Sequence, residues 1–167
     1  STRNVFRATA LTTREDPTYV SIVPGKSAEH LLLGAAPKEP FIWDRVRQEN
    51  PYVTDIALPL AGTYFHAFVS IDKSNEAQPT QTILSTLGAW RYLKLVVVVD
   101  DEIDVHDERE VLWAIATTVQ ADDDVVIVPD AVGNQLDPSS DEGITDKMGI
   151  DATKPEDGQY TLCEVPD

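Results

Sequence analysis

Acidic side chains are concentrated in one short stretch of the sequence, and they are the first candidates for chemistry. The segment VVVVDDEIDVHDERE, residues 96–110, places Asp100, Asp101, Glu102 and Asp104 directly after an apolar run. Carboxylates in this arrangement are typical of the metal-binding acid pair of a signalling receiver domain, or of a Ca²⁺ loop with ligands at alternate positions. A third alternative is a solvated strand end followed by a capped helix.

Both metal-binding alternatives fail on spacing. A Ca²⁺ loop that began at Asp100 would need Gly at its sixth position and Glu at its twelfth, where the sequence has Val105 and Val111. Only 66 residues (167 minus 101) follow Asp101, too few for the rest of a receiver domain. The next predicted strand ends at Val128, too early to present a phosphoacceptor.

The third alternative has a physical basis in helix capping. Asp107 can cap a helix that begins at Glu108, and Glu110 three residues later can complete a capping box. Acids in the first turn also favour the helix dipole. Val111, Leu112, Ile115 and Val119 are then predicted to face the sheet, with Trp113 on the outer side as a candidate interface residue. The acidic stretch is therefore interpreted as mostly structural.

The elements around this stretch predict an α/β fold with a mixed sheet. Leu95–Val99 and Val125–Val128 are continuously apolar and flank the helix Glu108–Val119, which is typical of a parallel β-α-β crossover. Helices are expected on both faces of the sheet. The other expected elements are the helices Ser27–Ala36, Glu39–Asn50 and Pro79–Leu93 and the strands Val53–Pro59 and Tyr64–Lys73.

The chain is expected to be a single domain, 1–167, that ends in an irregular segment. Residues 137–167 are predicted to be an extended tail with a short helix near Thr145–Gly149. Ligands bind at the carboxyl ends of parallel strands. The loops 100–107 and 129–138, which follow the two strands of the predicted crossover, are therefore expected to lie at the same edge.

The charge and composition narrow the classes of partner. The net charge of −16 argues against nucleic acid or an anionic membrane as a partner, because both are themselves negatively charged. No stretch reaches the about 20 apolar residues of a membrane span. One cysteine, Cys163, fits a reducing compartment, so a cytoplasmic protein is expected. The three histidines are too scattered for a zinc site.

Several segments together resemble a known family. VVVVDDEIDVHDEREVLWAIATTVQADDDVVIVPDA, residues 96–131, and DKMGIDATKP, residues 146–155, are similar to the C-terminal third of the UbiD-like decarboxylases. The resemblance extends from about Asn4 to Pro155. It implies reversible decarboxylation of aromatic or α,β-unsaturated acids with prenylated flavin mononucleotide (FMN), a metal ion at the flavin phosphate, and an oligomer built largely through the C-terminal domain.

The resemblance also implies that the catalytic groups lie elsewhere. In this family an Arg and two Glu, the latter in an EGPFGE-like segment, perform the acid–base chemistry, and this sequence contains no such segment. The chain is therefore expected to be an inactive fragment or small subunit, completed by a flavin-binding catalytic domain or large subunit in a homo- or hetero-oligomer. The alternative is an oligomerisation or scaffold module without a catalytic role.

Three residues are implied to lie near the active site. The loop VGNQLDP, residues 132–138, reaches the substrate in the family, so Leu136 and then Asn134 are the candidates for pocket residues; a simple turn is the alternative. Lys94 matches a basic position near the cofactor phosphate in some relatives, and a surface lysine is its alternative. No catalytic or metal-binding residue is predicted in the chain.

Overall fold

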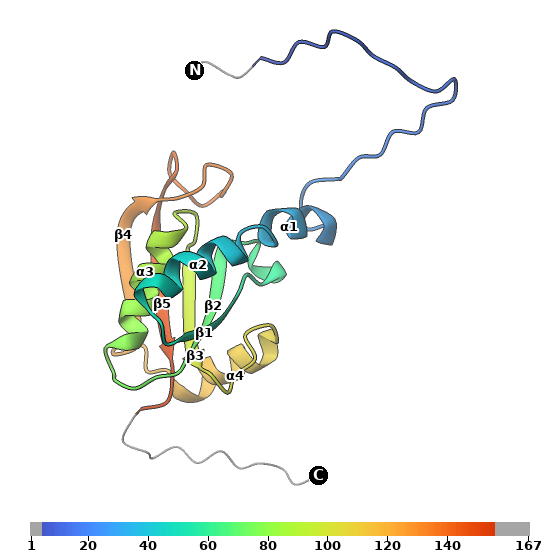
Figure 1. Cartoon of the computed structure of the whole chain (residues 1–167). Helices are drawn as coiled ribbons and strands as arrows, with labels where there is room; N and C mark the ends of the chain where they lie inside the picture. Colours follow the sequence, from blue (N-terminus) through green and yellow to red (C-terminus); the bar gives the residue numbers. More distant parts are fainter. Residues whose placement is uncertain (1–4, 156–167) are drawn as a thin grey trace, which may run out of the picture.

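The chain folds into a five-stranded mixed sheet with helices on both faces (Figure 1), which confirms the predicted fold class. The computed structural model describes residues 5–155. In chain order the elements are α1 (Ala28–Ala35), α2 (Glu39–Glu49), β1 (Val53–Ala57), the 3₁₀ turn η1 (Leu60–Gly62), β2 (His66–Ile71), α3 (Gln78–Ala89), β3 (Leu95–Asp100), α4 (Glu108–Thr118), β4 (Val125–Val132) and β5 (Ile144–Ala152).

The strand order is β1-β2-β3-β5-β4. The three central strands are parallel, with Val69 of β2 opposite Val98 of β3, and Val97 of β3 opposite Ile150 of β5. The two edge strands β1 and β4 are antiparallel to their neighbours. The parallel crossover therefore runs from β2 through α3 to β3.

The predicted parallel crossover from β3 through α4 to β4 is wrong. β5 lies between them, and β4 runs antiparallel to β5, with Val125 opposite Ile150 and Val132 opposite Ile144. An apolar run indicates a buried strand but carries no information about its direction. Because of the reversal, the loops after β3 and β4 lie at opposite ends of the strands. The expectation that they lie together at one end of the sheet is therefore also wrong.

The predicted tail helix near Thr145–Gly149 is wrong as well, because these residues belong to β5. The residues on the more buried face of β5 include Thr145, Lys147 and Gly149. They are polar or lack a side chain, so the apolar alternation that marks a strand is missing.

Two apolar clusters cover the two faces of the sheet. On one face α2 and α3 contribute Ile42 and Ile83 to a cluster with the buried residues of the sheet. On the other face α4 packs Val111 and Ala114 against β3. Each fully buried aliphatic side chain stabilises the fold by about 1.5–3 kcal/mol. Leu112, which was predicted to face the sheet, is instead 62% exposed.

Both edge strands are irregular. The pairing of β1 with β2 shifts register between Val53 and Asp55. The pairing of β4 with β5 shifts between Val128 and Ala131. The two residues within the second shift are Pro129 and Asp130, and Asp130 has a φ of 52°. These shifts are β-bulges.

Residues 5–26 form an irregular extended segment that leads away from the sheet (Figure 1). Phe6 and Tyr19 are each 90% exposed. Residues 5–155 contain no helix that is both long enough and apolar enough to cross a bilayer.

Candidate functional site

The loop between β4 and β5, residues 133–143, carries both predicted pocket residues. Asn134 is half-buried, and its side-chain Oδ1 accepts a hydrogen bond from the backbone N of Leu136 at 3.0 Å. This turn directs the Leu136 side chain outward, where it is 81% exposed. Asn side chains stabilise turns in this way. Asn134 and Leu136 therefore lie together, with Asn134 holding the backbone that presents Leu136.

Lys94 anchors this loop to the start of β3. Its Nζ lies 2.6 Å from Oδ2 of Asp137. This ion pair gives the buried oxygen a polar partner that it otherwise lacks. Lys94 Nζ also donates to Ser139 Oγ at 2.6 Å. The other carboxylate oxygen of Asp137 accepts from the backbone N and the hydroxyl of Ser139. Lys94 is thus brought next to the loop that carries Asn134 and Leu136, although it lies more than 35 residues before them in the chain.

The Lys94 ammonium holds the pKa of the Asp137 carboxyl below its ordinary value, with a further contribution from the Ser139 hydrogen bonds. A depressed pKa stabilises the fold at pH values above the ordinary pKa of the carboxyl, and this stabilisation is lost as the pH falls through the folded-state pKa. We expect Asp137→Asn to lower stability at neutral pH and to flatten the loss of stability below about pH 4. Urea unfolding between pH 2 and pH 7 tests this; an unchanged acid limb would contradict the pairing.

A hollow of about 340 Å³ lies beside the loop and is lined by Arg91, Tyr92, Asn134 and Gln135 among others. Arg91 donates from Nη2 to the Tyr92 hydroxyl at 2.9 Å, and its guanidinium lies 4.9 Å from the centre of the Tyr92 ring. Lys147 donates from Nζ to the Arg91 carbonyl at 2.7 Å. Lys147 is buried, and burial lowers its pKa.

The acidic stretch lies at the opposite end of the strands, after β3, and has the structural role predicted for it. Asp107 caps α4 by accepting the backbone N–H of Arg109 at 2.8 Å. The predicted capping box is wrong in its partner, because Glu110 accepts from the backbone N of Asp104 and not from that of Asp107. Within residues 5–155, no group of three or more His, Cys, Asp or Glu side chains is placed to hold a metal ion.

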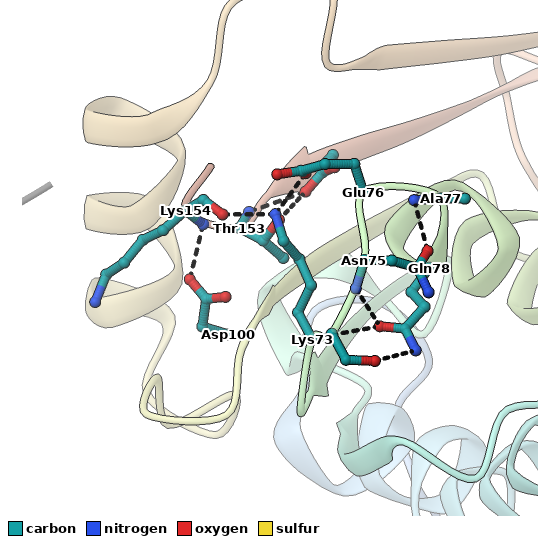
Figure 2. A network of polar contacts seen from close by, with 10 residues as sticks. Lys73, Asn75, Glu76, Ala77, Gln78, Asp100, Thr153 and Lys154 are labelled. Carbon is teal, nitrogen blue, oxygen red and sulfur yellow. Dashed lines mark hydrogen bonds and ion pairs between the residues drawn. The ribbon is translucent and has the colours of Figure 1, made fainter. Parts of the chain in front are cut away.

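The same end of the sheet contains a polar network that no motif in the sequence predicts (Figure 2). Lys73, whose side chain is only 6% exposed, donates to Glu76, to the hydroxyl of Thr153 and to the carbonyl of Lys154. Asp100 accepts the backbone N–H of Lys154 at 2.8 Å. Lys73 thus fixes the chain where it leaves β5.

Burial is the largest influence on the pKa of two carboxyl groups at this end of the sheet. Burial raises the pKa of Asp100, and the hydrogen bond from the Lys154 backbone and the charges of Lys154 and Lys73 counteract that rise. Burial likewise raises the pKa of Asp151, whose carboxylate accepts from the backbone and hydroxyl of Thr153. These two carboxylates are occupied in holding the end of β5.

The comparison with known families agrees with this fold. Residues 31–152 match the 3-octaprenyl-4-hydroxybenzoate carboxy-lyase C-terminal domain, the C-terminal domain of the UbiD-type enzymes. The chain belongs to this family.

Individual relatives and solved structures extend the comparison. The chain is 45% identical over 140 residues to the anhydromevalonate phosphate decarboxylase of Aeropyrum pernix, covering 83% of this chain and 32% of the relative. It is 44% identical over 144 residues to the enzyme of the same name from Methanothermobacter thermautotrophicus, covering 85% and 34%. The UbiD-class enzyme HmfF from Pelotomaculum thermopropionicum, solved with FMN, superposes with a TM-score of 0.84 at 44% identity, covering 92% of this chain and 35% of that one.

An evolved dimeric form of HmfF, solved with prenylated FMN, has a TM-score of 0.74 at 36% identity and covers 90% of this chain and 32% of its own. The chain therefore spans about a third of the length of the relatives it matches.

Proposed function

We propose that this chain is a component of a prenylated-FMN-dependent decarboxylase or carboxylase, as its C-terminal part or as a separate small subunit. The support is membership of the carboxy-lyase family and the similarity to UbiD-class enzymes solved with FMN and prenylated FMN. The acid–base groups belong to a flavin-binding domain or large subunit, because proton transfer needs a group within hydrogen-bond reach of the substrate. In this proposal the isolated chain is inactive, and it contributes to activity only within a cytoplasmic homo- or hetero-oligomer.

The described residues of this chain do not by themselves fit a flavin phosphate. Lys94 is the candidate contact, and its ammonium is already occupied by Asp137 and Ser139. We therefore assign the flavin and its metal ion mainly to the partner domain or subunit. In this proposal Lys94 acts mainly by fixing the loop, because Asp137 neutralises its charge.

Leu136 supplies one wall of the substrate pocket, and this loop is the observation on which the proposal depends. A side chain that is 81% exposed, on a backbone held by Asn134 and by the Lys94–Asp137 pair, has the position and rigidity of a contact for another molecule. The substrate is an aromatic or α,β-unsaturated acid. The names of the archaeal relatives favour a phosphorylated unsaturated acid, anhydromevalonate phosphate.

Leu136→Lys in the assembled enzyme tests the pocket assignment. We expect the variant to assemble normally and to lose about tenfold or more in turnover, because a charge replaces an apolar wall. Leu84→Lys is the matched control, since Leu84 is an exposed leucine on the outer side of α3. Release of CO₂ and gel filtration are the measurements. Unchanged turnover in the assembled Leu136→Lys enzyme would refute the pocket role.

A second candidate function is an oligomerisation module without a pocket role. Leu112 and Trp113 are neighbours on α4 and are 62% and 44% exposed, which is typical of a surface that contacts another chain. The native mass and elution partners of the polypeptide separate the two functions. Elution with a flavin-binding protein, or a native chain about three times this length, supports the enzyme component. Elution only with itself favours the module.

A further inference from the structure

We propose that Arg91, with the carboxamides of Asn134 and Gln135, forms the binding site for the phosphoryl end of the substrate. The inference rests on the proposed function and deepens it. It concerns the hollow beside the loop 133–143, which is separate from the Lys94–Asp137 pair that holds this loop.

Arg91 has the chemistry and the fixed orientation that a phosphate site needs. It is exposed, lies between α3 and β3, and lines the hollow. Its contacts with Tyr92, a hydrogen bond of 2.9 Å and a ring stack of 4.9 Å, restrain the guanidinium. A guanidinium has five N–H donors. One is used by Tyr92, and the planar fork of the others matches two phosphate oxygens.

The backbone below Arg91 is also held in place. The buried Lys147 reaches across from β5 and donates to the Arg91 carbonyl at 2.7 Å. This contact orients the segment that carries the guanidinium.

The carboxamides of Asn134 and Gln135 supply the other hydrogen-bond donors of the proposed site. The Oδ1 of Asn134 is used by the backbone of Leu136, so its amide nitrogen is the group that remains to donate. Gln135 lines the same hollow. Gly143 has a φ of +88°, and a Cβ there would lie 3.1 Å from Cγ of Gln135, so the glycine leaves room for this side chain.

The charged side chains that line the hollow are Arg91 and Glu142, in a chain whose net charge is −16. Lys94 and Asp137 compensate each other at 2.6 Å. The exposed carboxylate of Glu142 also lines the hollow and opposes an anion. Arg91 balances this negative charge, and the planar fork of its guanidinium, rather than net charge, is what matches a phosphate.

Position links the hollow to the proposed pocket. Asn134 lines the hollow and also holds the backbone of Leu136. The hollow and Leu136 therefore belong to the same loop, so a substrate that packs against Leu136 can place its far end in the hollow. A phosphate there would bind remotely from the reacting carboxylate, and such remote binding raises kcat/KM.

The test compares two acids in the assembled enzyme: the phosphorylated acid proposed above and the same acid without its phosphate. We expect Arg91→Met to lower kcat/KM for the phosphorylated acid about tenfold or more and to leave the other acid nearly unchanged. Arg91→Lys should retain part of the preference. Inorganic phosphate should compete with the phosphorylated acid in the wild type and much less in Arg91→Met. Arg47→Met, which removes an exposed arginine that packs on Trp43 of α2, is the matched control.

The outcomes distinguish the two proposals. If Arg91→Met affects both acids equally, or neither, the phosphate site is refuted while the proposed function stands. If the wild-type enzyme turns over both acids equally well but is sensitive to Leu136→Lys, the phosphate site is again refuted alone. An assembled wild-type enzyme that decarboxylates neither acid overturns the proposed function together with the phosphate site.

Discussion

Replacement of Lys73 by Met is expected to lower the free energy of unfolding by about 3 kcal/mol, because it removes a buried charge with three acceptors. The Lys73 ammonium joins the loop after β2 to the end of β5 through Thr153 and the Lys154 carbonyl (Figure 2). Met keeps the approximate length and volume of the side chain and cannot donate. The hydroxyl of Thr153 still contacts Asp151, whereas the Lys154 carbonyl loses its charged donor.

Urea unfolding of Lys73→Met measures this loss. Lys26→Met is the matched control, because Lys26 is an exposed lysine in the irregular segment before α1, and its removal should change stability little. A double-mutant cycle of Lys73→Met with Asp100→Asn should show coupling, since both side chains hold Lys154. Equal stability of the wild type and Lys73→Met would show that the network contributes nothing to the fold.

Gly149→Ala is expected to lower the free energy of unfolding by about 2–3 kcal/mol, because the added methyl group overpacks the core. Gly149 lies in β5 beneath α3. A Cβ at this position would be 2.1 Å from Cγ2 of Ile83, which is fully buried. Neither the central strand nor the buried side chain can move aside cheaply. The glycine lets α3 lie close to the sheet.

Gly88→Ala is the matched control. Gly88 lies inside α3, and a methyl group added to it would meet nothing within 4 Å, so the substitution should stabilise the helix by about 0.5–1 kcal/mol. Ile83→Val should recover part of the loss in Gly149→Ala, because it removes the Cδ1 methyl group, which would lie 3.0 Å from the added Cβ. Thermal and urea unfolding provide the values. A Gly149→Ala protein as stable as the wild type would mean that α3 stands further from β5.

Most elements of the fold can be predicted from the sequence because their apolar patterns are regular. β3 is a run of valines, and α4 begins at the predicted cap, Asp107. β5 cannot be recognised in this way because its buried positions include Thr145, Lys147 and Gly149, which no apolar pattern reveals. The direction of β4 cannot be deduced either, because the pairing partner that fixes it is the unrecognised strand.

The grouping of three candidate residues follows from the sequence, while their role in a site stays a prediction. The family resemblance singles out Asn134, Leu136 and Lys94, and the structure brings them together through Asp137. It does not single out Arg91 or Lys73. Their contacts join residues 56 and 80 positions apart in the chain, and no local pattern encodes such pairs.

The bulges at Val53–Asp55 and at Pro129–Asp130 determine how this sheet can grow. An edge strand with a continuous ladder of free N–H and C=O groups is a template for another strand, and edge-to-edge pairing leads to aggregation. Here Pro129 removes one donor, and the bulges twist both edges away from a regular ladder. These features disfavour a continuous sheet shared by two copies of this domain. The exposed side chains of Leu112 and Trp113 on α4, by contrast, offer a surface whose contacts do not depend on the edge strands.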